Sequence, residues 1–147
     1  MKPKNRINLR DKTEEDYDFI YNILRENMLE RYIKHWGGWS DEEFNKGYGR
    51  GIVKIVEQEG EKIGFLHYEI LSDHLYILNI QLKSSVQGRG IGTFLMKVLE
   101  KETKKNALSK IRLLVFKDNP ALKFYKSLGY IKEIENREAS LVLEKII

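Results

Sequence analysis

The chain has 147 residues, 41% of them apolar and 33% charged, which is enough apolar side chain for the core of one compact domain over residues 1–147. The 26 basic and 22 acidic residues give a net charge of +4, but the two signs are interleaved rather than gathered in a basic stripe, so we expect no nucleic-acid partner. Cysteine is absent, which excludes disulfides, thiolate metal sites and a cysteine nucleophile.

The sequence carries no sign of a membrane or metal partner. No apolar run approaches the about 20 residues that span a bilayer, and residues 1–4 lead into no apolar signal-like segment. The three histidines lack the spacing of metal ligands, and we expect no metal. We therefore expect a cytoplasmic protein.

The first third of the sequence predicts a strand and two helices. The strand covers residues 7–10, and residues 13–16 resemble a capping box, with a threonine followed three residues later by an acid. Apolar side chains then recur at helical spacing, at Tyr17, Ile20, Leu24 and Met28. A second helix is expected at residues 41–48.

The remainder predicts a β-meander, a glycine-rich loop, and two helices alternating with strands. Strands are expected at 52–57, 62–71 and 74–82, the first two joined by a hairpin at 58–61. After the glycines, apolar residues recur at helical spacing, at Ile91, Phe94, Leu95, Val98 and Leu99. A buried strand at 111–116, a helix at 119–128 with Pro120 in its first turn, and strands at 130–134 and 140–144 complete the chain. This order predicts a mixed α/β sheet with a strand–helix–strand crossover.

Three glycines at alternate positions, Gly88, Gly90 and Gly92, separate a strand from an amphipathic helix. Glycines allow backbone amides to approach a ligand, and a helix N-terminus adds unpaired N–H groups, so the loop suits a phosphate. A tight turn that binds nothing is the competing interpretation. The loop matches neither the G-x-x-x-x-G-K-[ST] pattern nor the G-x-G-x-x-G dinucleotide pattern, because its final spacing differs.

The loop Gln87-Gly88-Arg89-Gly90-Ile91-Gly92 resembles motif A, Q/R-x-x-G-x-G/A, of the GNAT superfamily of N-acetyltransferases. A second segment, Asn119-Pro-Ala-Leu-Lys-Phe-Tyr-Lys-Ser-Leu-Gly-Tyr130, resembles the family pattern N-x-x-A-x-x-x-Y-x-x-x-G-F/Y. With the opening residues, the resemblance spans essentially the whole chain. It implies an α/β (α+β) fold with a mixed, mostly antiparallel central sheet flanked by about four helices, and acetyl-CoA as co-substrate.

The resemblance also implies roles for individual residues. Backbone amides from Gly88 to Thr93 would hold the cofactor pyrophosphate, with Arg89 as a helper, and the main chain from Ile80 to Leu82 would pair with the pantetheine arm. An N–H group near Leu82 is the expected oxyanion donor. Asn119 would contact the cofactor arm. The cofactor-binding set is thus Ile80, Leu82, Gln87, Gly88, Arg89, Gly90, Ile91, Gly92, Thr93, Asn119 and Tyr125.

The candidate proton-transfer groups are Tyr125, Tyr76 and Glu69. Tyr125 matches the family tyrosine that protonates the leaving thiolate, and the competing interpretation is a core aromatic residue at helical spacing with Leu122 and Leu128. Many relatives carry a glutamate on the strand before the loop, but here that strand lacks a carboxylate, and Tyr76 stands in the corresponding place. Glu69 on the neighbouring strand is a rival, so the general base stays open.

The resemblance places the acceptor pocket on the first two helices and their connection. Tyr32, Trp36 and Trp39 are the candidate contacts, with packing against the sheet as the alternative for the two tryptophans. We expect acetyl transfer to a primary amine of a small molecule or a peptide or protein, by direct attack in a ternary complex. The alternative is a catalytically silent acyl-CoA-binding sensor of the same fold. The acceptor's identity and the acyl range stay open, and a homodimer is allowed.

Overall fold

The structure is a computed structural model that describes residues 6–147. These residues form two compact units: unit 1 comprises residues 6–67 and 79–95, and unit 2 comprises residues 68–78 and 96–147. The strand order is β1-β2-β3-β4-β5-β7-β6, a mixed, mostly antiparallel sheet, as expected for the fold class. Within the described residues, no helix is long and apolar enough to cross a membrane.

The elements follow the predicted order along the chain. The strands are β1 (Ile7–Asp11), β2 (Ile52–Gln58), β3 (Glu61–Ile70), β4 (Leu75–Leu82), β5 (Lys110–Phe116), β6 (Lys132–Asn136) and β7 (Ser140–Ile146). The helices are α1 (Tyr17–Trp36), α2 (Asp41–Tyr48), α3 (Ile91–Lys105) and α4 (Ala121–Ser127), with short 3-10 turns η2 (Glu14–Asp16) and η3 (Ser84–Val86).

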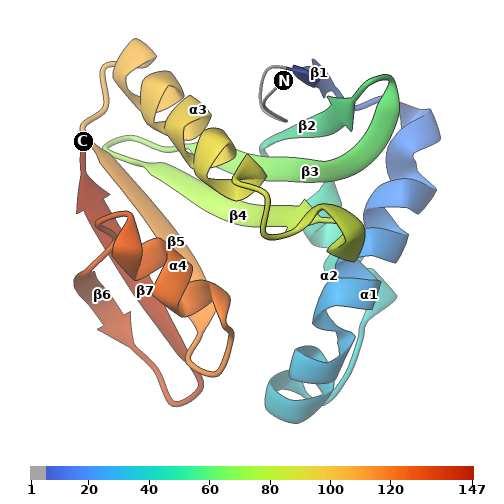
Figure 1. Ribbon diagram of the computed structural model, residues 1–147. Coiled ribbons are helices and arrows are strands. Elements are labelled where there is room, and N and C mark those ends of the chain that lie inside the picture. Colours follow the sequence, from blue (N-terminus) through green and yellow to red (C-terminus); the bar gives the residue numbers. More distant parts are fainter. Residues whose placement is uncertain (1–5) are drawn as a thin grey trace. The chain divides into compact units, whose positions relative to one another are not determined.

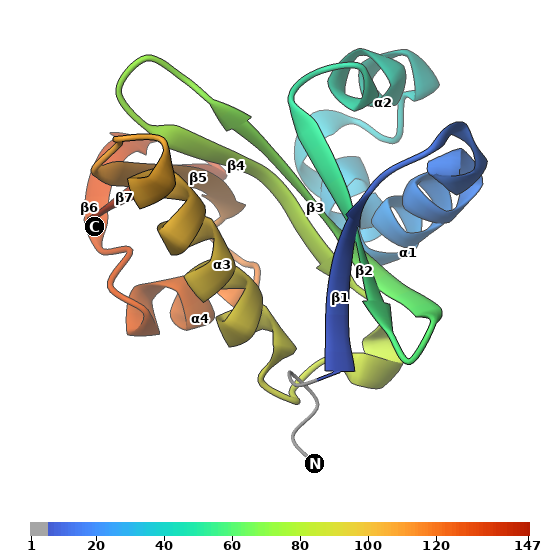
Figure 2. The ribbon, with the colours of Figure 1, turned by 90° about the horizontal axis from the view of Figure 1, so that it is seen from above.

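Unit 1 has one apolar core between two helices and the first strands. The core is built from Ile20, Ile23 and Leu24 of α1, Phe44 of α2, Val53 and Ile55 of β2, and Phe65 of β3. Figure 2 shows α1 and α2 beside β2 and β3 in this unit. The predicted stripe of α1 is confirmed, because Ile20 and Leu24 are buried while Tyr17 and Met28 pack against the same core.

A buried carboxylate joins the start of α1 to the strands of unit 1. Asp16 is 1% exposed and accepts two bonds from Arg10, at 2.8 and 3.0 Å, while the Lys62 ammonium lies 2.6 Å from the same side chain. The amide of Thr13 donates to Asp16 Oδ2 at 2.8 Å, which confirms the acidic half of the predicted capping box. The Arg10 bond is the main reason that the pKa of Asp16 lies far below its usual value.

Unit 2 contains the crossover that the sequence predicts. Residues Leu75, Tyr76 and Ile77 of β4 pair in parallel with β5, and α3 supplies the connection that parallel strands require. β7 pairs antiparallel with both β5 and β6. Figure 1 shows α4 lying over β5 and β7.

The boundaries of the last elements differ from the predicted ones. Helix α4 begins at Ala121 rather than residue 119, because Asn119 Oδ1 accepts from the Ala121 amide at 2.9 Å and caps the helix from outside. β6 begins at Lys132 rather than residue 130, because the Tyr130 amide still donates to the Tyr125 carbonyl at 3.1 Å. Between them Gly129 has φ +99°, a left-handed conformation that favours glycine.

Candidate active site

The glycine loop in unit 1 contains two glycines in the left-handed conformation with open space beside them. Gly88 and Gly90 have φ of +77° and +83°, and a β-carbon added at either would meet nothing within 4 Å. Helix α3 begins directly after Gly90, whose carbonyl accepts from the Phe94 amide at 3.1 Å. The amides of Ile91, Gly92 and Thr93 are therefore in the first turn, where no intrahelical acceptor exists. The loop leaves room for an anion and supplies donors and a positive helix end.

Arg89, in this loop, faces a pocket beside the β2–β3 hairpin. Its side chain is exposed and lines a pocket with Lys83, Ser85 and Val86, together with residues of the β2–β3 hairpin. That hairpin contributes Glu59 and Glu61 to the same pocket. The two acids lower the positive potential that Arg89 and Lys83 present there.

The end of β4, which the sequence predicts to contact the cofactor, is held by side-chain amides. Nδ2 of Asn27, on α1, donates to the Leu82 carbonyl oxygen at 3.0 Å, and Nε2 of Gln87 donates to the same oxygen at 3.0 Å. Asn27 is not among the residues predicted from the sequence. A signal was present, because Asn27 follows buried Ile23 by four residues and is a polar residue on the inward stripe of the helix.

Close packing of β3 against this strand end depends on Gly64. A β-carbon at Gly64 would overlap the Gln81 carbonyl oxygen and would lie 3.1 Å from Leu82 Cα. The next residue after β4 is also fixed, since the Lys83 amide donates to the Ile63 carbonyl at 2.8 Å. The main chain from Gln81 to Lys83 is therefore packed closely against β3 and is hydrogen-bonded at the Leu82 oxygen and the Lys83 nitrogen.

Tyr125, the candidate acid, lies on α4 in unit 2. Its ring is half-buried, 5.2 Å from Phe124 and 6.4 Å from Tyr130 in an edge arrangement. Burial raises the pKa of Tyr125 to about 12, so the hydroxyl keeps its proton at neutral pH. A protonated phenol is the form that a general acid needs.

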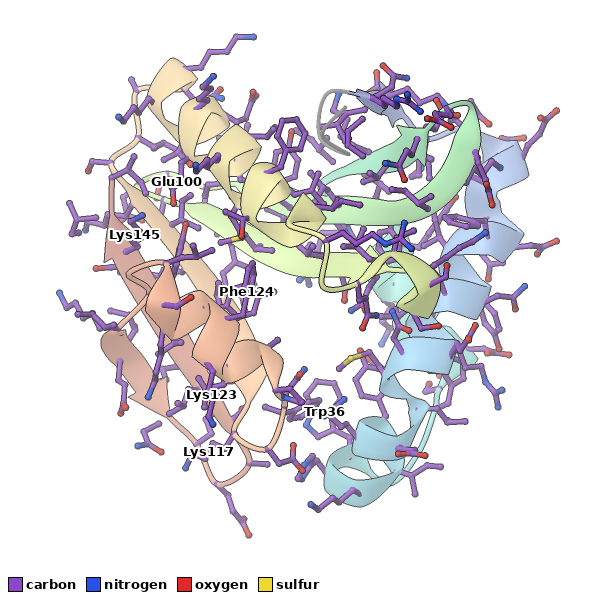
Figure 3. All side chains as sticks on the ribbon, viewed as in Figure 1. Trp36, Glu100, Lys117, Lys123, Phe124 and Lys145 are labelled. Atoms are coloured by element: carbon purple, nitrogen blue, oxygen red, sulfur yellow. The ribbon has the colours of Figure 1, made fainter. Side chains whose placement is uncertain are left out.

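Tyr130, which contacts the Tyr125 ring, is held by Glu100 and Lys145. Tyr130 is fully buried and its hydroxyl donates to Glu100 Oε2 at 3.0 Å. Lys145 Nζ donates to the same oxygen at 3.0 Å, and Figure 3 shows the Glu100 and Lys145 side chains directed toward each other. Burial is the largest reason that the pKa of Tyr130 is raised, followed by the Glu100 charge. Tyr130 therefore stays protonated and packs in a fixed position against the Tyr125 ring.

The remaining candidates in unit 2 lie on strands and at the start of α4. Tyr76 is half-buried, 6.3 Å from the His74 ring, and its register partner on β5 is Arg112. Its neighbours Leu75 and Ile77 are buried, so burial alternates along this part of β4. Glu69 is half-buried near the end of β3. Asn119 uses its side-chain oxygen to cap α4, so only its amide nitrogen could donate to a ligand.

The three acceptor-side aromatics form one stack at the end of α1. The Tyr32 ring lies 4.9 Å from Trp36 and 5.8 Å from Trp39, both nearly parallel. Trp39 packs against the unit 1 core and donates to Asp41 Oδ1 at 2.8 Å, which supports the packing alternative for this residue. Trp36 is 57% exposed at the outer end of the stack. Burial raises the pKa of Tyr32 to about 12.

The acid nearest the aromatic stack, Asp41, is engaged by neighbouring side chains. Asp41 Oδ1 also accepts from the Tyr21 hydroxyl at 2.6 Å, so this acid, which could attract an amine, is already bonded to two donors. Over residues 6–147, no group of three His, Asp or Glu side chains is arranged to hold a metal ion.

Comparison with known proteins decides the family. Residues 10–130 match the Acetyltransferase (GNAT) family. The chain belongs to this family. It is 31% identical over 114 residues to the uncharacterized protein YdhI of Bacillus subtilis (strain 168), covering 74% of this chain and 69% of that protein.

Solved GNAT structures share the fold. PaiA N-acetyltransferase from Thermoplasma acidophilum, solved in complex with coenzyme A, has a TM-score of 0.76 and 21% identity, covering 96% of this chain and 99% of that one. A GNAT family acetyltransferase from Elizabethkingia anophelis, solved with acetyl-CoA bound, has a TM-score of 0.70 and 16% identity, covering 97% and 99%. These structural neighbours bind coenzyme A or its acetyl thioester.

Proposed function

We propose that the protein is an acetyl-CoA-dependent N-acetyltransferase that modifies a primary amine of a small molecule, peptide or protein. One observation carries the proposal: in a chain of the GNAT family, the loop before α3 has two glycines with positive φ and open space where their β-carbons would be. The first-turn amides of α3 supply the donors that a pyrophosphate requires. The residues present therefore fit the cofactor.

The proposed cofactor set keeps the residues predicted from the sequence. Main-chain groups from Gln87 to Thr93 would bind the pyrophosphate, and main-chain groups of Ile80 and Leu82 would align the pantetheine arm. Asn119 would donate through its amide nitrogen, since its oxygen caps α4. When bound, the cofactor supplies an acetyl group activated as a thioester.

In the proposed reaction the neutral amine attacks the thioester carbonyl carbon. A carbon–nitrogen bond forms, the carbon–sulfur bond breaks, the amine nitrogen loses a proton to a base, and the sulfur gains one from Tyr125. Solvent then returns a proton to the tyrosine. With a pKa of about 12, the Tyr125 hydroxyl carries its proton at neutral pH. Because the thiolate has a lower reference pKa, near 8.5, the proton transfer to sulfur must be concerted with cleavage of the carbon–sulfur bond. Tyr76 and Glu69 are the proposed alternatives for the base.

The proposed acceptor contacts are Tyr32, Trp36 and Trp39. Trp36 supports this role best, since its indole is exposed at the end of a supported aromatic stack. An aromatic face attracts the cationic head of an amine before deprotonation, with a free energy of about 0.5–1 kcal/mol at exposed sites. Trp39 would act by supporting Tyr32.

The test is release of free thiol from acetyl-CoA in the presence of an amine panel containing polyamines, lysine-containing peptides and peptides with free N-termini. The protein has no cysteine, so all thiol in the assay comes from the cofactor. Thiol release that requires one amine, with mass spectrometry showing one added acetyl group on it, supports the enzyme. Tight acetyl-CoA binding without turnover on any amine would favour the sensor alternative. Light scattering on the same sample measures whether the protein is a dimer.

A further inference from the structure

The carbonyl oxygen of Leu82 accepts hydrogen bonds from two side-chain amides that come from different elements. Asn27 reaches it from α1 and Gln87 from the glycine loop, each at 3.0 Å. A carbonyl oxygen has two lone pairs, so these bonds fill its acceptor capacity. We call Asn27, Gln87 and the Leu82 carbonyl the Leu82 clamp.

Other hydrogen bonds hold the clamp in place. The second N–H of Asn27 donates to Gln81 Oε1 at 3.1 Å, and Gln81 Nε2 donates to Asn79 Oδ1 at 3.1 Å. The Lys83 amide, on the other side of the clamped peptide, donates to the Ile63 carbonyl at 2.8 Å. The peptide group between Leu82 and Lys83 is therefore bonded at both its oxygen and its nitrogen, which leaves it one orientation.

The clamp also closes a ring of backbone. The Gln87 side chain bonds to Leu82, the last residue of β4. This bond closes a loop of main chain, residues 83–86, that contains the 3-10 turn η3. Asn27 then connects this ring to α1, a helix that carries the candidate acceptor residues Tyr32 and Trp36. The connections run in series from α1 through Asn27, the Leu82 oxygen and Gln87 to the loop.

We propose that Asn27 is a positioning residue for the cofactor, acting through the Leu82 carbonyl on the loop that holds the pyrophosphate. The inference rests on the proposed function for the identity of the ligand. If Asn27 cannot donate, the Leu82 carbonyl keeps only the Gln87 bond, and the loop that Gln87 ties to it loses its hydrogen-bonded connection to α1. A loop that becomes ordered only when the ligand binds loses conformational entropy at that step, which weakens binding. A loop that is already ordered avoids this loss.

The Leu82 clamp limits which main-chain group of Leu82 can bond to the pantetheine arm. Because both lone pairs of its carbonyl are occupied, Leu82 cannot accept a hydrogen bond from the pantetheine arm without breaking the clamp. Any contact of Leu82 with the arm is through its N–H. Pairing that uses a carbonyl must come from earlier in β4, such as Ile80.

The first arm of the test measures coenzyme A affinity by titration calorimetry. Asn27→Leu, which keeps the side-chain size and removes both donors, should raise the Kd about five-fold, the equivalent of about one hydrogen bond. Asn22→Leu is the matched control, because Asn22 lies on the same helix and is exposed. Its Kd should equal that of the wild type.

The second arm separates positioning from general destabilisation. Gln87→Met should also raise the Kd about five-fold. The double variant should bind about as weakly as the weaker single variant, because breaking either of two contacts in series already breaks the connection. Multiplicative effects would show that the two amides act independently and would overturn the proposal. So would a wild-type Kd in Asn27→Leu.

The third arm needs no ligand. Hydrogen exchange should become faster at amides 83–90 in Asn27→Leu and stay at the wild-type rate in Asn22→Leu. If the wild type fails to bind coenzyme A, the proposed function is wrong, and this arm still tests the clamp. If Asn27→Leu fails to fold, Gln87→Met provides the same exchange and affinity measurements, and unchanged values in that variant would contradict the clamp.

Discussion

Gly64 on β3 and Gln81 on β4 approach so closely that a β-carbon at position 64 would overlap the Gln81 carbonyl oxygen. The overlapping atom is backbone, so it cannot swing aside as a flexible side chain could. The contact lies beside Leu82, whose position the Leu82 clamp also determines. Gly64 therefore fixes the sheet at the strand end that borders the candidate site.

Gly64→Ala should destabilise the protein by about 1–3 kcal/mol, because the added methyl forces the two strands apart. It should also weaken coenzyme A binding. Gly47→Ala is the control: Gly47 lies inside α2, an added β-carbon there meets nothing within 4 Å, and alanine favours a helix by about 0.5–1 kcal/mol. Urea unfolding measures both changes, and a stable Gly64→Ala variant would contradict the close approach.

Gly90→Val should abolish measurable coenzyme A binding, because valine strains a residue with φ +83° and projects into the space of the proposed pyrophosphate. Gly60→Val carries nearly the same backbone strain, at φ +81°, but in the β2–β3 hairpin. The two variants should lose similar stability in thermal unfolding while only Gly90→Val loses binding. Equal affinities in calorimetry would remove the loop from the cofactor site.

Tyr125→Phe should lower kcat about 10²-fold or more, the usual effect of removing a general acid, while the Kd for coenzyme A stays near the wild-type value. Burial raises the pKa of Tyr125 to about 12, so the wild-type rate should show no loss from tyrosine ionisation between pH 7 and pH 9. Tyr130→Phe is the control: it loses the bond to Glu100 and about 1 kcal/mol of stability but should keep its kcat. A wild-type rate in Tyr125→Phe would assign the acid role elsewhere.

Asp16 should make stability depend on acid pH. Its folded pKa is lowered, first by the Arg10 hydrogen bond and then by Lys62 and Thr13, so its contribution is complete above the unfolded value near 3.9 and is lost as pH falls toward the folded value. Asp16→Asn should cost about 1–3 kcal/mol at pH 7, since it removes the buried carboxylate that Arg10 and Lys62 both contact. The difference from wild type should shrink below about pH 4.

Asp11→Asn is the control for Asp16. Asp11 pairs with Lys54 at 2.5 Å, but its side chain is 80% exposed, so its removal should cost far less stability than the removal of buried Asp16. Urea unfolding at pH 7 and at pH 3 measures both variants. Equal losses for Asp16→Asn and Asp11→Asn at pH 7 would show that the buried network adds little.

Trp36→Ala and Trp39→Ala should separate acceptor contact from packing. Trp39 belongs to the packed aromatic cluster of unit 1, so its truncation should cost about 3–5 kcal/mol. Trp36 is 57% exposed, so its truncation should cost much less stability but raise the KM for the amine identified in the panel. An unchanged KM in Trp36→Ala would exclude this indole from the acceptor site.

Local patterns in the sequence were enough to predict most of the fold. The stripe around Ile20 and Leu24, the glycines before α3 and the β4–α3–β5 crossover all depend on neighbours within about one helical turn or one strand. Boundaries were less accurate where side chains cap an element, as at Asn119, or where a chain turn persists, as at Tyr130. The family could be predicted for the same reason, since its two motifs are short and local.

Tertiary structure alone decided what holds the candidate site together. Asn27 and the Leu82 carbonyl are 55 positions apart, and only the folded chain brings them to hydrogen-bonding distance. The same is true of Gly64 with Gln81, where steric overlap with a distant backbone, rather than a turn, requires glycine. A pattern of residue types shows which side chains can donate, accept or pack. Which partner each one meets depends on distances that the fold sets.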